Sequence, residues 1–186
     1  MRGEETQLLG AVLETPGSTR FCMPGTHSKW VSMEATVVTG FQTFMTGELY
    51  SILSQHSILS HSIGETGDID PTDRAFLTGV RDAWSRPAQF THQLFSIRAG
   101  QLLHDRKTDD NRARLSGLTI GVELAGAGVG SHEEVALVAS GRLGALYRAA
   151  LDACETPVRS IDADVAVRRG LLEAWRRDRS GGRKNA

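Results

Sequence analysis

The 186-residue sequence predicts an α/β fold, and three observations carry this prediction. Runs rich in Val, Thr, Phe and Trp at about 19–24, 29–33 and 35–43 follow one another with tight turns, which is typical of an antiparallel meander. A compact apolar run at 135–139 and a second predicted strand at 157–161 are each followed by a helical pattern, which favours parallel strands joined by a right-handed crossover. A long helical stretch, 46–126, separates the two parts.

The N-terminal elements are a helix and the meander. The helix begins after Gly3 and extends to about residue 14, because its apolar residues recur on one face: Leu8, Leu9, Val12 and Leu13. The Pro-Gly-Ser sequence at 16–18 ends this helix. The meander turns at 25–26 and 34–35, where Gly-Thr and Glu-Ala interrupt the strand pattern.

The central stretch reads as helices around a polar loop. Thr46 is the predicted N-cap of a helix that extends through Leu53, and the turn-rich residues 60–71 form the loop. Further helices are expected over 72–84, 87–98 and 109–126. The glycine-rich run 126–130 lacks the preceding strand of a dinucleotide-binding motif, so it is expected to end the last of these helices.

The final third predicts strand, helix, strand and helix. The strand at 135–139 is typical of one buried on both faces, and the chain turns at 140–141 into a helix that ends near Cys154. After the strand at 157–161, a last helix begins at Asp162 or Asp164 and ends at about residue 176. This order is that of a half-domain of ribonuclease H-like sugar kinases and actin-like ATPases. The predicted organisation is one ribonuclease H-like lobe over 1–176, with the helical insertion at about 46–126 and a flexible tail over 177–186.

Composition excludes several classes of partner. The net charge of −1 leaves no basic footprint for nucleic acid, and the cationic residues after 175 are expected to be a solvated terminus. No apolar run approaches the roughly 20 residues of a membrane span, so no membrane partner is expected. Charges at residues 2, 4 and 5 argue against a signal peptide. Cys22 and Cys154 are isolated in apolar surroundings, which favours buried thiols and a cytoplasmic location.

The first candidate site is the pair Glu4 and Glu5 at the start of the first helix. The helix dipole favours a carboxylate there, and such a group suits a base that takes a proton from a substrate hydroxyl during phosphoryl transfer. The alternative is an ordinary acidic first turn.

The second candidate is the turn after the first strand. Gly25 lets the backbone approach a phosphate, Thr26 offers a hydroxyl and Lys29 a positive charge, while His27 orients or caps the turn. The alternative is a hairpin turn that contacts only water.

The third candidate is Ala139-Ser140-Gly141, at the end of the buried strand. Ligands of open α/β sheets gather at the carboxyl ends of strands, and a helix N-terminus here would meet a nucleotide. The alternative is a plain strand-to-helix turn. His56 and His61 are five residues apart without a ligand partner at metal-binding spacing, which favours a surface loop over zinc.

Three motifs, at 1–7 (MRGEETQ), 24–31 (PGTHSKWV) and 44–49 (FMTGEL), resemble those of the 2-dehydro-3-deoxygalactonokinase family in order and spacing. The resemblance continues through 115–123 and 135–147 to the last helix. It implies transfer of the ATP γ-phosphate to the 6-hydroxyl of 2-dehydro-3-deoxy-D-galactonate with Mg²⁺, in a two-lobed fold of the hexokinase–actin type.

The resemblance also assigns roles to residues. Glu4 is the expected base with Glu5 in reserve, and 24–26 corresponds to the second phosphate motif. Residues 139–141 correspond to the adenosine motif, although the family more often has Ala-Gly-Thr there. Thr46 and Glu48 line the cleft beside the sugar unless Thr46 only caps its helix. Arg2 suits the substrate carboxylate.

Members of this family begin with a further lobe that carries an Asp-x-Gly-Ser-Thr motif, to which nothing in this sequence corresponds. The chain is therefore expected to be the C-terminal lobe alone and to have negligible kinase activity by itself. The alternatives are a kinase of the same fold for another sugar acid, and a non-catalytic nucleotide-binding or oligomerisation module. A homodimer is a further expectation.

Overall fold

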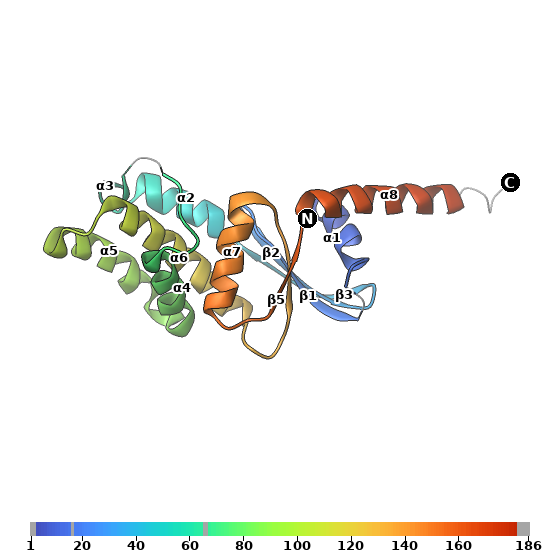
Figure 1. Ribbon diagram of the computed structural model, residues 1–186, viewed down its shortest axis with the longest axis horizontal. Coiled ribbons are helices and arrows are strands. Elements are labelled where there is room, and N and C mark those ends of the chain that lie inside the picture. The colour runs from blue at the N-terminus through green and yellow to red at the C-terminus, as the bar shows by residue number, and fades with distance from the viewer. Residues whose placement is uncertain (1–2, 16, 65–66, 182–186) are drawn as a thin grey trace.

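The computed structural model describes residues 3–15, 17–64 and 67–181, and its centre is a five-stranded mixed sheet (Figure 1). The strands lie in the order β3-β2-β1-β4-β5. Pairing is antiparallel between β1 and β2 and between β2 and β3, and parallel between β1 and β4 and between β4 and β5. The predicted meander and the predicted parallel unit are therefore both confirmed. The strands span β1 (Ser18–Met23), β2 (Ser28–Glu34), β3 (Val37–Phe44), β4 (Val135–Val138) and β5 (Val158–Ile161).

Helices cover both faces of this sheet. Because successive side chains of a strand point to opposite faces, Phe21 and Ala136 pack on one face with α1 (Glu4–Val12) and α8 (Ala163–Gly181). Cys22 and Leu137 pack on the other face with α7 (Gly141–Ala153) and with helices of the central stretch. The central strands are thus buried on both sides, and for β4 this burial was predicted from its continuous apolar run.

The central stretch forms a helical part at one end of the sheet (Figure 1). It consists of α2 (Thr46–His56), α3 (Ser60–Ile63), α4 (Arg74–Ser85), the short 3₁₀ turn η1 (Pro87–Gln89), α5 (Phe90–His104) and α6 (Thr108–Ala127). Within this part, α4 and α6 lie backbone to backbone. Glycine at positions 117 and 121 allows this, because a side chain there would collide with the backbone carbonyls of α4. Gly128 ends α6 in the left-handed conformation (φ 70°), which confirms the prediction for the glycine-rich run.

Several predicted boundaries differ from the structure. The expected loop 60–71 contains the short helix α3, α5 extends to His104, and α8 extends to Gly181 rather than ending near residue 176. Met45, not Thr46, is the N-cap of α2, so the predicted cap was wrong. Cys22 and Cys154 are buried free thiols, as predicted. In the described part of the chain, no helix combines the length and the apolar character needed to cross a membrane.

Candidate active site

Three parallel strands end at the same edge of the sheet, and each is followed by a polar turn. Cys22 of β1 lies opposite Leu137 of β4, which lies opposite Ser160 of β5. The turn that begins at residue 24, the turn at 139–141 and Asp162 therefore leave the sheet side by side. Ligands of α/β proteins gather at this kind of edge.

The turn after β1 is held against the start of α2. The backbone N–H of Glu48 donates to the carbonyl of Thr26 (3.1 Å). This approach requires glycine at position 47, since a Cβ there would lie 2.7 Å from the Gly25 carbonyl oxygen and 2.8 Å from the Thr26 Cα. His27 Nε2 lies 2.5 Å from Glu48 Oε2. The fold thus brings together the predicted phosphate turn and the predicted substrate residue Glu48.

Glu4 and Lys29 form an ion pair beside this turn. Lys29 Nζ lies 3.6 Å from Glu4 Oε1 and donates to the backbone carbonyl of His27 (2.8 Å). The Lys29 side chain is mostly buried, while Glu4 stays partly exposed at the start of α1. Glu5 differs, because its Oε2 accepts a hydrogen bond from the N–H of Gly3 (2.9 Å). Of the two candidate bases, Glu4 is the one joined to the turn through Lys29.

The position of Glu4 depends on how α1 crosses α8. A side chain at Gly10 would collide with the carbonyl of Ala166, and one at Gly170 with the carbonyl of Thr6. The two glycines let the helices touch backbone to backbone, which fixes the start of α1 next to β2.

A buried carboxylate that the sequence reasoning missed connects the walls of the site. Glu123 of α6 is 1% exposed; its Oε1 accepts from Trp30 Nε1 (2.8 Å) and its Oε2 from the Tyr147 hydroxyl (2.6 Å). The side chains of Thr46 and Ser28 also hydrogen-bond to it. Burial raises the pKa of Glu123, and these hydrogen bonds oppose the rise. One side chain thereby joins β2, α2, α6 and α7.

The signal for Glu123 was present in the sequence. It is an acidic residue within the apolar segment 118–124, where a carboxylate needs partners if the helix is buried. The partners lie at distant positions in the chain, so the sequence alone did not identify them.

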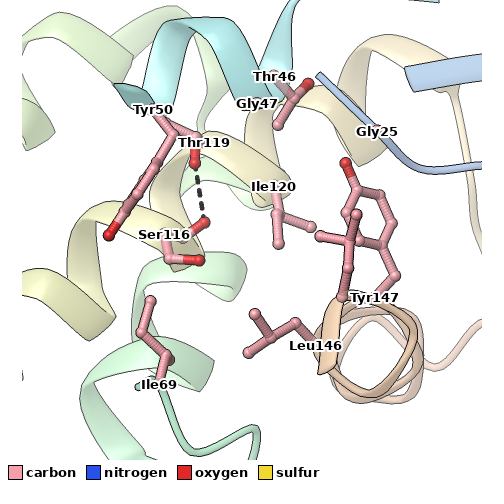
Figure 2. A pocket seen from close by; sticks show the side chains of 11 residues that line it. Gly25, Thr46, Gly47, Tyr50, Ile69, Ser116, Thr119, Ile120, Leu146 and Tyr147 are labelled. Atoms are coloured by element: carbon pink, nitrogen blue, oxygen red, sulfur yellow. Dashed lines mark hydrogen bonds between the residues drawn. The ribbon is translucent and has the colours of Figure 1, made fainter. Parts of the chain in front are cut away.

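A cavity of about 160 Å³ opens beneath the predicted phosphate turn, between α2, α6 and α7 (Figure 2). Gly25 and Gly47 form part of its wall. Figure 2 shows Ile120 and Leu146 reaching into the space between α6 and α7. The other lining residues are Thr46, Tyr50, Ile69, Ser116, Thr119, Leu143 and Tyr147. The cavity is therefore mainly apolar, with hydroxyl groups around it.

Ala139, Ser140 and Gly141 line a different cavity, open to solvent and about 430 Å³ in volume, on the other side of α7. The Ser140 hydroxyl donates to Asp162 Oδ2 (3.0 Å) and accepts from the N–H of Ala163 (2.9 Å). Hydrogen bonds, first from the Val165 backbone and then from Ser140, lower the pKa of Asp162. The Ser140 side chain thus ties two turns together, which leaves backbone groups for a ligand.

Within the described ranges, no group of three or more His, Cys, Asp and Glu side chains has the geometry of a metal site. A nucleotide-bound Mg²⁺ needs only one or two protein carboxylates besides water and phosphate oxygens, so the carboxylates at the turn, Glu4 and Glu48, fit such an ion. Arg2 lies outside the described residues. His56 and His61 are exposed, but the predicted loop was wrong, because His56 ends α2 and His61 lies in α3.

Comparison with known proteins supports the family resemblance of the motifs at 1–7, 24–31 and 44–49. Residues 1–174 match the family model described as 2-keto-3-deoxy-galactonokinase. The chain belongs to this family. A relative named probable 2-dehydro-3-deoxygalactonokinase DgoK1, from Rhizobium meliloti (strain 1021), is 52% identical over 179 residues, which cover 95% of this chain and 58% of the relative. The 2-dehydro-3-deoxygalactonokinase of Escherichia coli (strain K12) is 36% identical over 173 residues, covering 92% of this chain and 58% of that protein.

The fold also matches a solved structure. A crystal structure of a Sinorhizobium meliloti protein, described as a candidate 2-dehydro-3-deoxygalactonokinase, superposes with a TM-score of 0.91 at 52% identity. The match covers 95% of this chain and 60% of that one. The chain thus spans 58% of the length of each of the two curated relatives and corresponds to their C-terminal part.

Proposed function

We propose that this chain forms the nucleotide-binding lobe of a sugar-acid kinase. The kinase would transfer the ATP γ-phosphate to the 6-hydroxyl of 2-dehydro-3-deoxy-D-galactonate. The observation that carries the proposal is the pairing of Glu4 with Lys29 beside the turn 24–28, in a chain of the 2-keto-3-deoxy-galactonokinase family. The strand order β3-β2-β1-β4-β5, with its antiparallel and parallel halves, supports a ribonuclease H-like lobe of the hexokinase–actin type.

The phosphate turn would hold the β- and γ-phosphates of ATP. Gly25 presents its backbone without a side chain, and the exposed Thr26 offers a hydroxyl. Lys29 places a positive charge at the base of the turn, where its hydrogen bond to the His27 carbonyl fixes the ammonium group. Charge that develops on the transferred phosphoryl group would be stabilised there.

Glu4 would be the base that accepts the proton of the substrate hydroxyl. It is partly exposed, so a substrate can reach it, and Lys29 holds its carboxylate near the phosphate turn. Glu48, paired with His27, faces the same turn and would contact the sugar acid. Mg²⁺, when bound with ATP, would neutralise phosphate charge, with Glu48 as the protein carboxylate near it.

The apolar cavity suits the adenine ring. Its volume of about 160 Å³ and its Ile120 and Leu146 side chains offer a flat heterocycle an apolar slot next to the phosphate turn. Ala139, Ser140 and Gly141, at the turn into α7, line the separate cavity on the other side of that helix, and the adenosine role that the resemblance implies for them would place the nucleoside there instead. The Thr46 hydroxyl bonds to Glu123, so Thr46 would act on the cavity wall rather than on the sugar.

The test is sugar-acid-dependent ADP formation by the natural gene product, including any sequence that the gene encodes ahead of Met1. We predict that Glu4→Gln lowers kcat by about 10²- to 10⁴-fold, the range of a general base, and leaves ATP affinity nearly unchanged. Glu5→Gln is the matched control and should retain most activity, because the Glu5 carboxylate bonds to the helix N-terminus.

Loss of activity in Glu5→Gln but not in Glu4→Gln would overturn the assignment of the base. If the enzyme phosphorylates only a different sugar acid, the proposed substrate is wrong and the proposed kinase reaction stands. ATP binding without transfer would indicate a nucleotide-binding module. We expect negligible turnover from the 186-residue chain alone, because it corresponds to only the C-terminal part of its relatives.

A further inference from the structure

A polar cavity of about 380 Å³ lies in the helical part, and no step proposed above uses it. It lies between the start of α4 and the first half of α6, and three arginines line it. Its charged and hydroxyl-bearing lining residues are Asp73, Arg74, Thr78, Arg106, Asp110 and Arg114. It shares no lining residue with the apolar cavity beneath the phosphate turn.

Arg106 is held beside the cavity by its packing and by its backbone. Its guanidinium packs over Gly100, where a Cβ would lie 2.9 Å from the Arg106 Cζ, and its backbone N–H donates to the Gly100 carbonyl (3.3 Å). The preceding residue, Asp105, takes the left-handed conformation (φ 50°) that turns the chain at the end of α5. Among the described residues, no side-chain hydrogen bond or ion pair of Arg106 is found.

Arg114 contributes a second fixed guanidinium. Its Nη2 donates to Asp82 Oδ2 (2.8 Å), which anchors the side chain, whereas its Nε–H is buried without a partner in the described part of the chain. The exposed Arg74 adds a third positive charge at the cavity.

We propose that this cavity binds a small hydroxylated anion whose phosphate or carboxylate group lies between Arg106 and Arg114. Guanidinium groups match such oxyanions by paired, charge-assisted N–H···O bonds. The carboxylates of Asp73 and Asp110 would accept hydrogen bonds from the hydroxyl groups of the ligand, and the Thr78 hydroxyl would accept or donate one. The site would serve a second, regulatory ligand, because it lies apart from the phosphate turn while sharing α6 with the apolar cavity.

The test is isothermal titration of the chain with inorganic phosphate at constant ionic strength. We expect saturable binding that Arg106→Ala weakens about tenfold or more, the loss expected for charged hydrogen bonds. Arg106→Lys keeps the positive charge but lacks the planar guanidinium group, so it should weaken binding by a smaller factor. If Arg106→Ala fails to fold, this variant tests whether Arg106 binds phosphate. Arg168→Ala removes an exposed positive charge on α8, at the other end of the molecule, and should leave affinity unchanged (Figure 1).

Repeating the titration with a hexose monophosphate and with an aldonic acid identifies the source of the anion. Tighter binding of either than of inorganic phosphate supports the proposal and names the class of ligand. Absence of saturable binding by all three probes overturns it. Equal affinities in the wild type, Arg106→Ala and Arg106→Lys also overturn it, because phosphate would then bind elsewhere, such as at the turn 24–28. If Arg168→Ala weakens phosphate binding as much as Arg106→Ala does, the loss reflects the net charge of the protein and contradicts the proposed site.

Discussion

Glu123 is the residue on which the geometry of the candidate site most depends. Its two oxygens bond to Trp30 on β2 and to Tyr147 on α7, and Thr46 at the start of α2 bonds to it as well. A buried carboxylate is unfavourable unless donors surround it, and here they come from every wall of the apolar cavity. The residue therefore couples the position of the phosphate turn to that of the cavity.

The raised pKa of Glu123 predicts a pH dependence of stability. The folded state holds this proton more tightly than the unfolded state, whose carboxyl has its ordinary pKa of 4.5. Where the folded state binds more protons, the free energy of unfolding falls as pH rises. Relative to Glu123→Gln, the wild type should therefore lose stability as pH rises from 4.5 through the raised pKa. Urea unfolding at a series of pH values measures this difference.

Glu34→Gln provides the control, since Glu34 is exposed at the end of β2. Its difference from the wild type should be nearly flat over the same pH range. A difference between wild type and Glu123→Gln that stays constant, or that grows in favour of the wild type as pH rises, contradicts the account of Glu123.

At the scale of elements, the close contact between α2 and the turn after β1 positions the proposed phosphate site. Gly47 makes this contact possible, and the Glu48 N–H closes it by bonding to the Thr26 carbonyl. Helix propensity alone would favour alanine over glycine at position 47. If Gly47→Ala lowers the free energy of unfolding, the cause is therefore the contact between α2 and the turn, and not helix propensity.

Gly47→Ala should push α2 away from the turn. We predict a loss of about 1–3 kcal/mol in the free energy of unfolding, as for overpacking, together with weaker ATP binding. Gly130→Ala is the matched control, because nothing lies within 4 Å of a Cβ at that position, and its effect should stay within about 0.5 kcal/mol. Equal effects of the two substitutions on stability and on ATP affinity would show that the contact has no such role.

Elements whose pattern is local were predictable, while contacts between distant elements were not. The strands and their pairing were predicted from the β-branched and aromatic residues of β1 and β2, the turns between the strands and the apolar run of β4. The helix end was predicted from the glycines after α6. Residues 25–29 were predicted to lie together because they are neighbours in the sequence and share one turn. Thr46 was predicted as a cap because Thr is common there, but its hydroxyl bonds to Glu123, 77 positions away in the chain. Ser140 was likewise placed correctly at the sheet edge, without its bond to Asp162.

At the scale of the whole molecule, the cavity lies where the sheet meets the helical part. The sheet supplies the turn after β1, and the inserted helices α2 and α6, together with α7, supply the apolar walls. Neither part alone encloses the space, so the insertion between β3 and β4 is what gives the sheet edge an apolar slot. The fold as a whole matches that of the solved relative over 95% of the chain.

The most direct measurement is isothermal titration of the 186-residue chain with ATP and Mg²⁺. The account predicts one ATP per chain, and much weaker binding of inorganic tripolyphosphate, because the adenine ring would fill the apolar cavity while the phosphates meet the turn. Absence of saturable ATP binding, or equal affinity for tripolyphosphate, would contradict the assignment of this lobe to the nucleotide.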